Sequence, residues 1–442
     1  MWRMCCGLLV AALTCRTTVV QCLELDPKLR THAFYYAWYG TPGVDGRWKH
    51  WDHEVLPHWT PQVSAQYPAI GTRFKPPQAL HSPFYPLAGP YSSADPATVR
   101  RHFRELRQAG VGVAALSWWG PQWRQGTTDT QGVSTDQLLP VVLEAAEAEG
   151  LRVAFHLEPY PGRSAATTRE DLLYLMRRVG GSPAVLRLRR RGASLAPGAG
   201  GDDATAGGAV NGTAVDAVNA TAGGAHGLPL FYVYDSFHIP PEDWAALLQP
   251  GGEASLRGTE ADGIFVGLWL NQHDGDMQLL PGGFDGFYTY FASEAVSYGA
   301  DPSNWPTLSA WARDHSMLFV PSVGPGYDDS KIRPWNAAAT RDREGGERYR
   351  RWWEAALDAQ PAAVSITSFN EWGEGTQIEA ARAPDGGEAG GGTARYQSYG
   401  GTTGHDEWLY MRLTAGFAAR LGAQQRQRGG AQQHGGGAHS EL

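Results

Sequence analysis

Apolar residues along the chain gather into eight short runs, and a segment with the apolar spacing of a helix follows most of them. The run Val-Gly-Val-Ala-Ala-Leu-Ser at 111–117 is apolar at nearly every position and does not alternate with polar residues. Strands have such continuously apolar sequences when both faces of a parallel sheet are covered by other elements. The predicted strands are 32–39, 111–119, 151–160, 228–236, 262–270, 284–292, 317–323 and 362–369.

The helical segments carry start signals of their own. Ser93-Ala-Asp-Pro96 offers an N-cap and an early proline for a helix that ends near Ala109. The other predicted helices are 135–150, 168–180, 241–249, 302–315, 343–360 and 405–421, with a weak helical turn near Met277. Eight strand–helix units predict an α/β fold, a single closed (β/α)8 TIM barrel. An open doubly wound sheet is the alternative, but no glycine fingerprint follows the first strand.

Three segments depart from this rhythm. The segment from Gly40 to Tyr91 is rich in Pro, His and Trp, and we expect it to be a long, ordered first βα loop. Residues 187–227, before the fourth strand, are rich in Gly, Ala and Arg and are expected to form a disordered insertion. The tail 422–442 is expected to be disordered as well. The folded domain therefore spans 32–421.

The N-terminus is typical of a secretory signal peptide over residues 1–22. Arg3 precedes an apolar run from Cys5 to Thr14, and uncharged residues lead to Cys22. The run is too short for an ordinary membrane span, so we expect membrane association only if the segment stays uncleaved as an anchor. All four cysteines lie within 1–22, which leaves the folded domain without a disulfide framework or a cysteine metal site.

Further features agree with entry into the secretory pathway. Asn211-Gly-Thr and Asn219-Ala-Thr are glycosylation sequons, and the chain ends in His439-Ser-Glu-Leu442, a near match to a lumenal retrieval signal. The net charge of −8 and a pI near 6.0 argue against a nucleic-acid partner.

Carboxylates and aromatic side chains gather at the carboxyl ends of the predicted strands, where barrels of this type place their active sites. The last strand ends in Asn370-Glu-Trp-Gly-Glu374, with two carboxylates three residues apart. The chain also has 17 tryptophans, and indole rings often stack on sugars. The other strand-end candidates are Trp38, Tyr39, Trp118, Trp119, His156, Glu158, Tyr234, Asp235, Trp269, Asn271, Tyr288 and Tyr290.

This set of side chains favours the hydrolysis of a glycosidic bond, which needs one carboxylic acid and a second carboxylate as nucleophile or base. Glu371 and Glu374 can supply both, and an aromatic neighbour such as Trp372 would raise one pKa. Glu158 and Asp235 are candidates for a third acidic group.

Other chemistries have weaker signals. His50, His53 and His58 could ligate a metal, but their spacing matches no metalloenzyme motif, and we expect neither a metal nor a cofactor. No Gly-x-Ser-x-Gly nucleophile elbow and no phosphate-binding Gly-x-x-x-x-Gly-Lys-Ser/Thr loop occurs in the chain.

Several motifs, in order between about residues 32 and 421, resemble those of glycoside hydrolase family 99, the endo-α-1,2-mannosidases. They include Phe34-Tyr-Tyr-Ala-Trp-Tyr-Gly40, His50-Trp-Asp-His53, Phe155-His-Leu-Glu-Pro-Tyr160, Ile332-Arg-Pro-Trp-Asn336 and Ser368-Phe-Asn-Glu-Trp372. The resemblance implies a metal-free barrel that cleaves internal α-1,2-mannosidic bonds with retention, typically removing a glucosyl-mannose unit from an N-glycan. It implies a secretory lumen as the compartment, with the Golgi expected and ER retrieval or secretion as alternatives.

The resemblance also implies a mechanism without an enzymic nucleophile. Glu371 corresponds to the base that deprotonates the mannose 2-hydroxyl, which then closes on C1 to give a 1,2-anhydro sugar. Glu374 corresponds to the acid that protonates the leaving group and afterwards activates water. The predicted substrate-binding residues are Tyr39, His50, Trp119, Glu158, Tyr234, Asp235, Tyr290 and Asn370.

Two positions depart from the family pattern. Gly373 stands where animal members have histidine, and Trp119 stands where they have tyrosine. A tryptophan is found there in bacterial relatives that act on mannans, so an endo-α-1,2-mannanase with a mannosyl outer sugar is one alternative function. An inactive glycan-binding barrel, and a barrel glycosidase in which Glu371 is a nucleophile, are the others.

Overall fold

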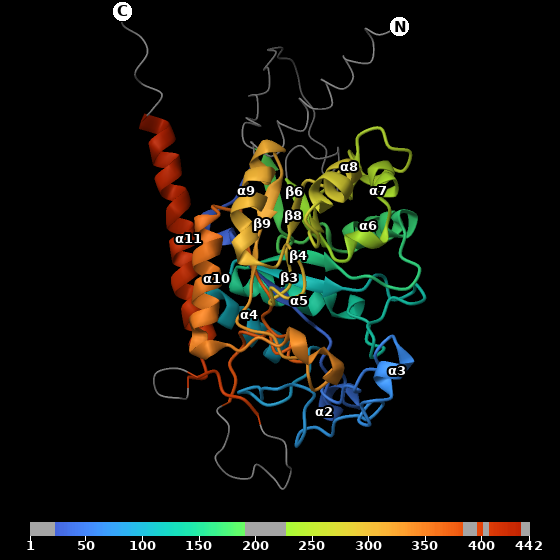
Figure 1. Ribbon diagram of the computed structural model, residues 1–442. Coiled ribbons are helices and arrows are strands. Elements are labelled where there is room, and N and C mark those ends of the chain that lie inside the picture. The colour runs from blue at the N-terminus through green and yellow to red at the C-terminus, as the bar shows by residue number, and fades with distance from the viewer. Residues whose placement is uncertain (1–22, 191–226, 383–395, 401–405, 435–442) are drawn as a thin grey trace, which may run out of the picture.

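The computed structural model describes residues 23–190, 227–382, 396–400 and 406–434 (Figure 1). Several sequence features lie outside these ranges: the predicted signal peptide with all four cysteines, the sequons at Asn211 and Asn219, and the C-terminal His439–Leu442. Within the described residues, no helix is both long and apolar enough to cross a bilayer.

Nine parallel strands form the central sheet, in the order β10-β11-β2-β3-β4-β6-β7-β8-β9. They are β2 (Thr31–Tyr35), β3 (Val113–Trp118), β4 (Arg152–Leu157), β6 (Leu228–Val233), β7 (Ile264–Leu268), β8 (Gly286–Tyr288), β9 (Leu318–Val320), β10 (Ser322–Val323) and β11 (Val364–Ile366).

The two ends of this order are neighbours in the chain, because only Pro321 separates β9 from β10. Proline has no N–H to donate to a strand ladder, and it therefore divides one predicted strand into two short ones. β9 pairs with β8 and β10 pairs with β11, so the sheet closes except at this proline. The predicted (β/α)8 barrel is confirmed.

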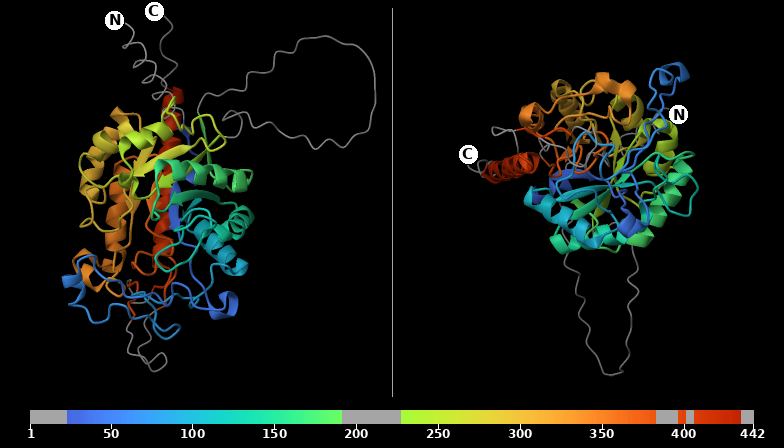
Figure 2. Two further views of the ribbon diagram at one scale, coloured as in Figure 1. Left: turned by 90° about the vertical axis from the view of Figure 1, so that its right-hand side faces the viewer. Right: turned by 90° about the horizontal axis from the view of Figure 1, so that it is seen from below.

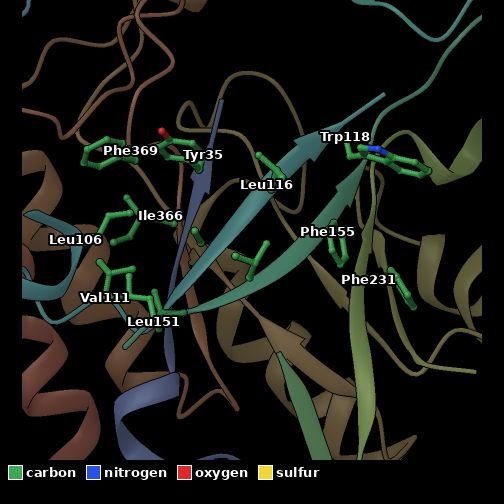
Figure 3. Close-up of a cluster of buried hydrophobic side chains, with 14 of the residues drawn as sticks. Tyr35, Leu106, Val111, Leu116, Trp118, Leu151, Phe155, Phe231, Ile366 and Phe369 are labelled. Atoms are coloured by element: carbon green, nitrogen blue, oxygen red, sulfur yellow. The ribbon is translucent and has the colours of Figure 1, made fainter. Parts of the chain in front are cut away.

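Successive residues of each strand point to opposite faces, and both faces are buried. In β4, Val153 and Phe155 belong to the layer between sheet and helices, whereas Ala154 belongs to the barrel interior. Figure 3 shows part of the outer layer, where Phe155 lies near Leu116 and Phe231 of the neighbouring strands. This double burial is why the strands are continuously apolar.

Helices form a ring around the strands, as the view from below shows (Figure 2). They are α4 (Pro96–Gln108), α5 (Leu139–Glu149), α6 (Ala165–Val179), α7 (Pro241–Leu248), α8 (Leu280–Gly282), α9 (Trp305–Asp314), α10 (Glu347–Asp358) and α11 (Leu409–His434). A π-helical turn over Gly275–Leu279 forms at the predicted turn near Met277.

Helix starts follow local capping chemistry. The Asp95 side chain accepts hydrogen bonds from two backbone N–H groups of the first turn of α4, as the sequence predicts. Helix α6 begins three residues earlier than the predicted start at 168, because Ser164 and Thr167 form a capping box.

Two predicted boundaries differ from the structure. Helix α11 continues to His434, beyond the expected end at 421, since the Ala, Gln and Arg residues that follow are good helix formers. The first four residues of the predicted insertion form strand β5 (Arg187–Arg190), which pairs antiparallel with β6 and with β1 (Leu23–Glu24). Leu188 of β5 is buried, so the fold extends further into the insertion than composition suggested. Residues 191–226 lie outside the described ranges.

Candidate active site

The carboxyl ends of the barrel strands meet at the lower end of the molecule in Figure 1, where long segments cover them. One is the first βα loop, which contains the short helices α2 (Pro42–Asp45) and α3 (Pro61–Ser64). The others are the 3-10 helix η6 (Pro334–Ala339) and the segment that follows β11. The predicted long first loop is therefore ordered and forms part of the site.

The segment after β11 is held by the residues that follow β2, Tyr36 through its backbone and Tyr39 through its hydroxyl. The Asn370 amide donates from Nδ2 to the Tyr36 carbonyl at 2.9 Å and accepts at Oδ1 from the Tyr36 N–H at 2.8 Å. The Tyr39 hydroxyl donates to the Asn370 carbonyl at 2.9 Å and accepts from the Trp372 N–H at 3.2 Å. Asn370 is fully buried and engaged by the chain itself, so it supports the loop, in contrast to the expected sugar contact.

Trp372 also faces the protein interior. Its indole N–H donates to Glu379 Oε2 at 3.0 Å, and the Tyr91 hydroxyl donates to the same oxygen at 2.7 Å. The indole is fully buried, and it anchors the strand-end loop from behind through this buried carboxylate.

Glu371 projects from this anchored loop and is almost fully buried. Its Oε1 accepts a hydrogen bond from the Gly373 N–H at 2.9 Å, and its own N–H donates to Ser368 Oγ at 2.7 Å. Burial raises the pKa of Glu371 well above its usual value, and the nearby Glu374 charge raises it further, while Arg333 opposes both.

Glu374 is the more accessible of the two carboxylates, with a side chain that is 20% exposed. Its Oε1 accepts from Arg333 Nη1 at 3.1 Å, and the same nitrogen donates to Asp329 Oδ2 at 3.1 Å. Burial raises the pKa of Glu374, and the Arg333 charge lowers it. Two carboxylates that influence each other in this way titrate as a pair, with a range of pH in which they hold a single proton.

Tyrosine hydroxyls and a third carboxylate surround the pair. The Tyr36 and Tyr290 hydroxyls share a hydrogen bond of 2.5 Å, and the Tyr234 ring lies 4.7 Å from that of Tyr290. Glu158 accepts from Ser117 Oγ at 2.8 Å. Burial raises the pKa values of these tyrosines well above normal, so their hydroxyls stay protonated and can donate to a sugar.

Three predicted site residues adopt a left-handed backbone conformation that non-glycine residues rarely occupy. The φ angles are 59° at His50, 46° at Asp235 and 52° at Tyr290. Such conformations cost about 1–3 kcal/mol each and tend to cluster at functional sites, where the surrounding structure maintains them. The same conformation occurs at Ser316, Glu344 and Gln360, so half of the described non-glycine residues that adopt it are predicted site residues.

His50 forms the other side of the site. Its ring stacks on Trp38 at 4.2 Å with an angle of 7° between planes, and its Nε2 contacts the buried carboxylate of Asp129. Burial raises the pKa of Asp129, but the His50 charge and hydrogen bond outweigh it and leave the pKa below normal. A cavity of about 440 Å³, lined by Trp48, Lys49, His50 and Arg73 among others, lies beside this pair.

Some predicted candidates lie elsewhere. Trp118 and Trp269 point into the outer layer, where Trp269 packs on Phe287 with ring centres 4.6 Å apart. Asn271 is exposed, and its side-chain amide donates a hydrogen bond to the Asp274 carboxylate. Trp119 is half-buried directly after β3, and its backbone N–H donates to Thr135 Oγ1 at 3.4 Å. Asp235 lies at the rim, where its carbonyl accepts from Arg163 Nη2 at 2.8 Å.

The structure brings to the site three charged residues that the sequence did not single out. Arg333 and Asp329 set the environment of Glu374, and Asp129 fixes His50. A signal for Arg333 was present, because it lies in the family-like motif Ile332-Arg-Pro-Trp-Asn336. Among the described residues, no three His, Cys, Asp or Glu side chains are placed to hold a metal ion.

Comparison with known proteins places these residues in context. The model of glycosyl hydrolase family 99 matches residues 27–422. A rat glycoprotein endo-alpha-1,2-mannosidase is 41% identical over 368 residues, which cover 83% of this chain and 71% of the relative. A human glycoprotein endo-alpha-1,2-mannosidase-like protein is 40% identical over 404 residues, covering 90% and 77%.

A solved structure agrees with the sequence relatives. The GH99 endo-alpha-mannosidase from Bacteroides thetaiotaomicron superposes with a TM-score of 0.71 at 35% identity, over 90% of this chain and 98% of that one.

Proposed function

The chain belongs to glycosyl hydrolase family 99, and we propose that it is a retaining endo-α-1,2-mannosidase that trims glucosylated high-mannose N-glycans. It is thus a glycoside hydrolase, and the resemblance of its motifs to this family is confirmed. The observation that carries the finer proposal is the pair Glu371 and Glu374 in the segment after β11. The two carboxylates interact, the first is buried and the second partly exposed, and Arg333 lies beside the second.

In the first step, Glu371 removes the proton of the 2-hydroxyl of the mannose at the cleavage point. The freed oxygen forms a bond to C1 while the bond from C1 to the leaving oxygen breaks, and Glu374 gives its proton to that oxygen. The product is a 1,2-anhydro sugar, so the substrate's own hydroxyl takes the place of an enzymic nucleophile.

In the second step, Glu374 takes a proton from water as the water oxygen bonds to C1. The bond from C1 to O2 breaks, and Glu371 returns its proton to O2. Each step inverts the configuration at C1, and two inversions give overall retention. Both carboxylates end in their starting protonation states, so the cycle needs no metal or cofactor.

The pair must hold one proton for this cycle, and that proton must be on Glu374 when the bond breaks. Burial raises the pKa values of both carboxylates, and the Arg333 charge lowers both. Sugar hydroxyls that donate to Glu371 stabilise its ionised form when the substrate binds. Substrate binding therefore moves the proton toward Glu374, which couples recognition of the 2-hydroxyl to catalysis.

The surrounding residues supply sugar contacts in this proposal. Tyr234 and Tyr290 donate hydroxyl hydrogen bonds, and Glu158 and His50 orient the reacting ring. The Tyr39 hydroxyl is already engaged by the Asn370 carbonyl and the Trp372 N–H, so Tyr39 supports the loop that carries the glutamates. Trp119 directly follows β3, and we assign it to the outer sugar. An indole there has no hydroxyl for an equatorial 2-OH and favours a mannosyl over a glucosyl outer unit. An endo-α-1,2-mannanase specificity is therefore the second candidate, carried by Trp119 alone.

The proposed place of action is the lumen of the secretory pathway, with the Golgi as the expected compartment. The names of the rat and human relatives refer to glycoproteins, which are processed there. The mature chain reaches the membrane only if residues 1–22 stay attached as an anchor.

The decisive experiment is product analysis on a glucosylated high-mannose glycan. We expect release of a glucosyl-mannose disaccharide, and NMR of the first product formed should show the α-anomer. Release of monosaccharides or of the β-anomer would contradict the proposal.

Variants of Glu371 and Glu374 distinguish the roles of the two carboxylates. Glu371→Gln and Glu374→Gln should each lower kcat by about 10²–10⁴-fold. An activated aryl leaving group should restore turnover only in Glu374→Gln, because only that variant lacks the acid. A covalent sugar trapped on Glu371 would favour the alternative in which Glu371 is a nucleophile. Full activity of either variant would contradict the catalytic role of the residue that it replaces. A wild-type chain that binds the glycan without turnover would support the inactive glycan-binding barrel.

A further inference from the structure

The rim of the active-site face carries an exposed indole with a defined position. Trp59 is 78% exposed, the largest exposed fraction among the large hydrophobic residues of the described chain. Its ring lies 3.8 Å from that of His58 and 5.1 Å from that of Trp335, with ring planes at 32° and 80°. We call His58, Trp59 and Trp335 the rim platform.

Hydrogen bonds fix the rim platform in place. Trp335 Nε1 donates to the Leu56 carbonyl at 3.1 Å, and the Leu56 N–H donates to the Ile332 carbonyl at 2.7 Å. His58 Nδ1 accepts from the Thr60 N–H at 2.9 Å, which sets the orientation of its ring. An aromatic surface that is both exposed and held in this way is preorganised for a ligand, because binding costs little side-chain entropy.

The same connections place the rim platform on the Glu374 side of the site. Trp335 is two residues from Arg333, whose guanidinium donates to Glu374. In the proposed mechanism Glu374 protonates the leaving oxygen, so the sugars beyond the cleaved bond extend from that carboxylate. Indole rings bind the C–H faces of sugars by stacking. A tryptophan at a solvent-exposed rim can stack on a sugar with its apolar face while its N–H stays in water.

We propose that Trp59, supported by His58 and Trp335, binds a mannose residue of the leaving-group portion of the substrate, beyond the sugar next to the cleaved bond. This inference rests on the proposed function. It assigns the rim platform a role in choosing long, branched glycans over short substrates, a specificity that the two glutamates alone do not provide.

The first test compares two substrates that share the same disaccharide donor and differ in the leaving group. One has a small aryl group and the other a high-mannose oligosaccharide. Trp59→Ala should lower kcat/KM for the oligosaccharide about tenfold through KM, which corresponds to one stacking contact, and leave the aryl substrate within about twofold. Equal losses on both substrates, or no loss on the oligosaccharide, would overturn the proposal.

The matched control is Trp123→Ala. Trp123 is 62% exposed and packs on Tyr174 of α6. Its removal should leave the ratio of the two kcat/KM values unchanged. A change of the same size as in Trp59→Ala would mean that any exposed indole has this effect, and the assignment to Trp59 would fall.

A binding measurement separates this inference from the proposed function. Calorimetry with a high-mannose oligosaccharide and the Glu374→Gln chain needs no turnover. Addition of Trp59→Ala should weaken binding about tenfold. If the wild-type chain cleaves neither substrate but Trp59→Ala still weakens oligosaccharide binding, the role of the rim platform is supported and the proposed function is contradicted. If Trp59→Ala leaves the affinity for the oligosaccharide unchanged, the proposed role of the rim platform is contradicted, whatever the turnover.

Discussion

The imidazole of His81 fills the space in front of Gly373: a Cβ on Gly373 would lie 2.9 Å from His81 Cδ2. The same Cβ would lie 3.1 Å from Glu371 Oε1. His81 is buried, its Nδ1 has no hydrogen-bond partner among the described residues, and it stacks on His53 at 5.6 Å. It therefore cannot move aside easily. The missing side chain at 373 and the imidazole at 81 are two parts of one packing arrangement beside Glu371, the proposed base.

The first prediction concerns this arrangement. Gly373→His should lower kcat at least about 10²-fold, because the new side chain displaces His81 or Glu371, and small displacements of a reacting group are costly. The paired exchange His81→Gly with Gly373→His should recover much of the loss, since one imidazole then occupies the shared space. Steady-state kinetics and thermal unfolding would measure both effects.

Gly416→Ala is the control for that series. Gly416 lies in α11, and a Cβ there meets nothing within 4 Å. We expect unchanged kcat and about 1 kcal/mol of added stability from the better helix former. An active Gly373→His single variant would show that the space in front of Gly373 does not constrain Glu371.

The second prediction concerns Arg333→Met. The Arg333 charge lowers the pKa values of both Glu371 and Glu374, so its removal raises both. The active pair holds one proton, and each limb of the pH profile marks the gain or loss of a proton by that pair. Both limbs of kcat/KM against pH should therefore move to higher pH. Arg351→Met, which removes an exposed partner of Glu344, should leave the profile in place. If the limbs of the kcat/KM profile of Arg333→Met lie at the same pH as those of the wild type, groups other than Glu371 and Glu374 control the pH dependence.

The third prediction uses the contact of His50 with Asp129. The folded protein holds the pKa of Asp129 below normal, so the stabilisation is present above the unfolded pKa of about 3.9 and is lost as pH falls through the lower folded value. Asp129→Asn should lower Tm at neutral pH and make the fall of Tm below about pH 4 shallower.

The comparison for this prediction is Asp314→Asn at the exposed end of α9. It should leave the curve of Tm against pH unchanged. An identical acid slope in the wild type and in Asp129→Asn would rule out the buried pair as the source of acid sensitivity.

The fourth prediction concerns the outer sugar. Trp119→Tyr introduces a hydroxyl at the end of β3 that can bond an equatorial 2-OH, and a glucosyl outer unit carries one there. The ratio of kcat/KM for glucosyl-mannose release to that for mannosyl-mannose release should rise by about tenfold, the worth of one hydrogen bond. Matched glycans and chromatography of the disaccharides would measure it. A strong glucosyl preference in the wild type would remove Trp119 as the determinant.

Sequence patterns were sufficient for the barrel because its strands are buried on both faces and therefore uniformly apolar. The same uniformity hides the direction of each side chain, and this explains why Trp118 and Trp269 were predicted to face the site but point into the outer layer. A strand that alternates polar and apolar residues reveals which side is inside; these strands do not.

The proposed catalytic pair, Glu371 and Glu374, could be singled out from the sequence because it follows closely after a predicted strand. Arg333 and Asp129 could not be derived from position, since both lie in long loops whose path depends on tertiary contacts. The end of α11 shows another limit, because composition rich in Gln and Gly suggested a mobile tail while a helix extends to His434.

Strand β5 leaves the barrel next to the first residues of β6, at the opposite end from Glu371 and Glu374, which follow the last residue of β11. The chain departs after Arg190 and returns at Gly227, and the pairing of β5 with β1 and β6 holds the departure point. Evolution can thus lengthen or shorten the sequence between these residues without altering the geometry of the glutamates. For protein engineering, the same junction is a place to insert a reporter or an affinity label while turnover is preserved.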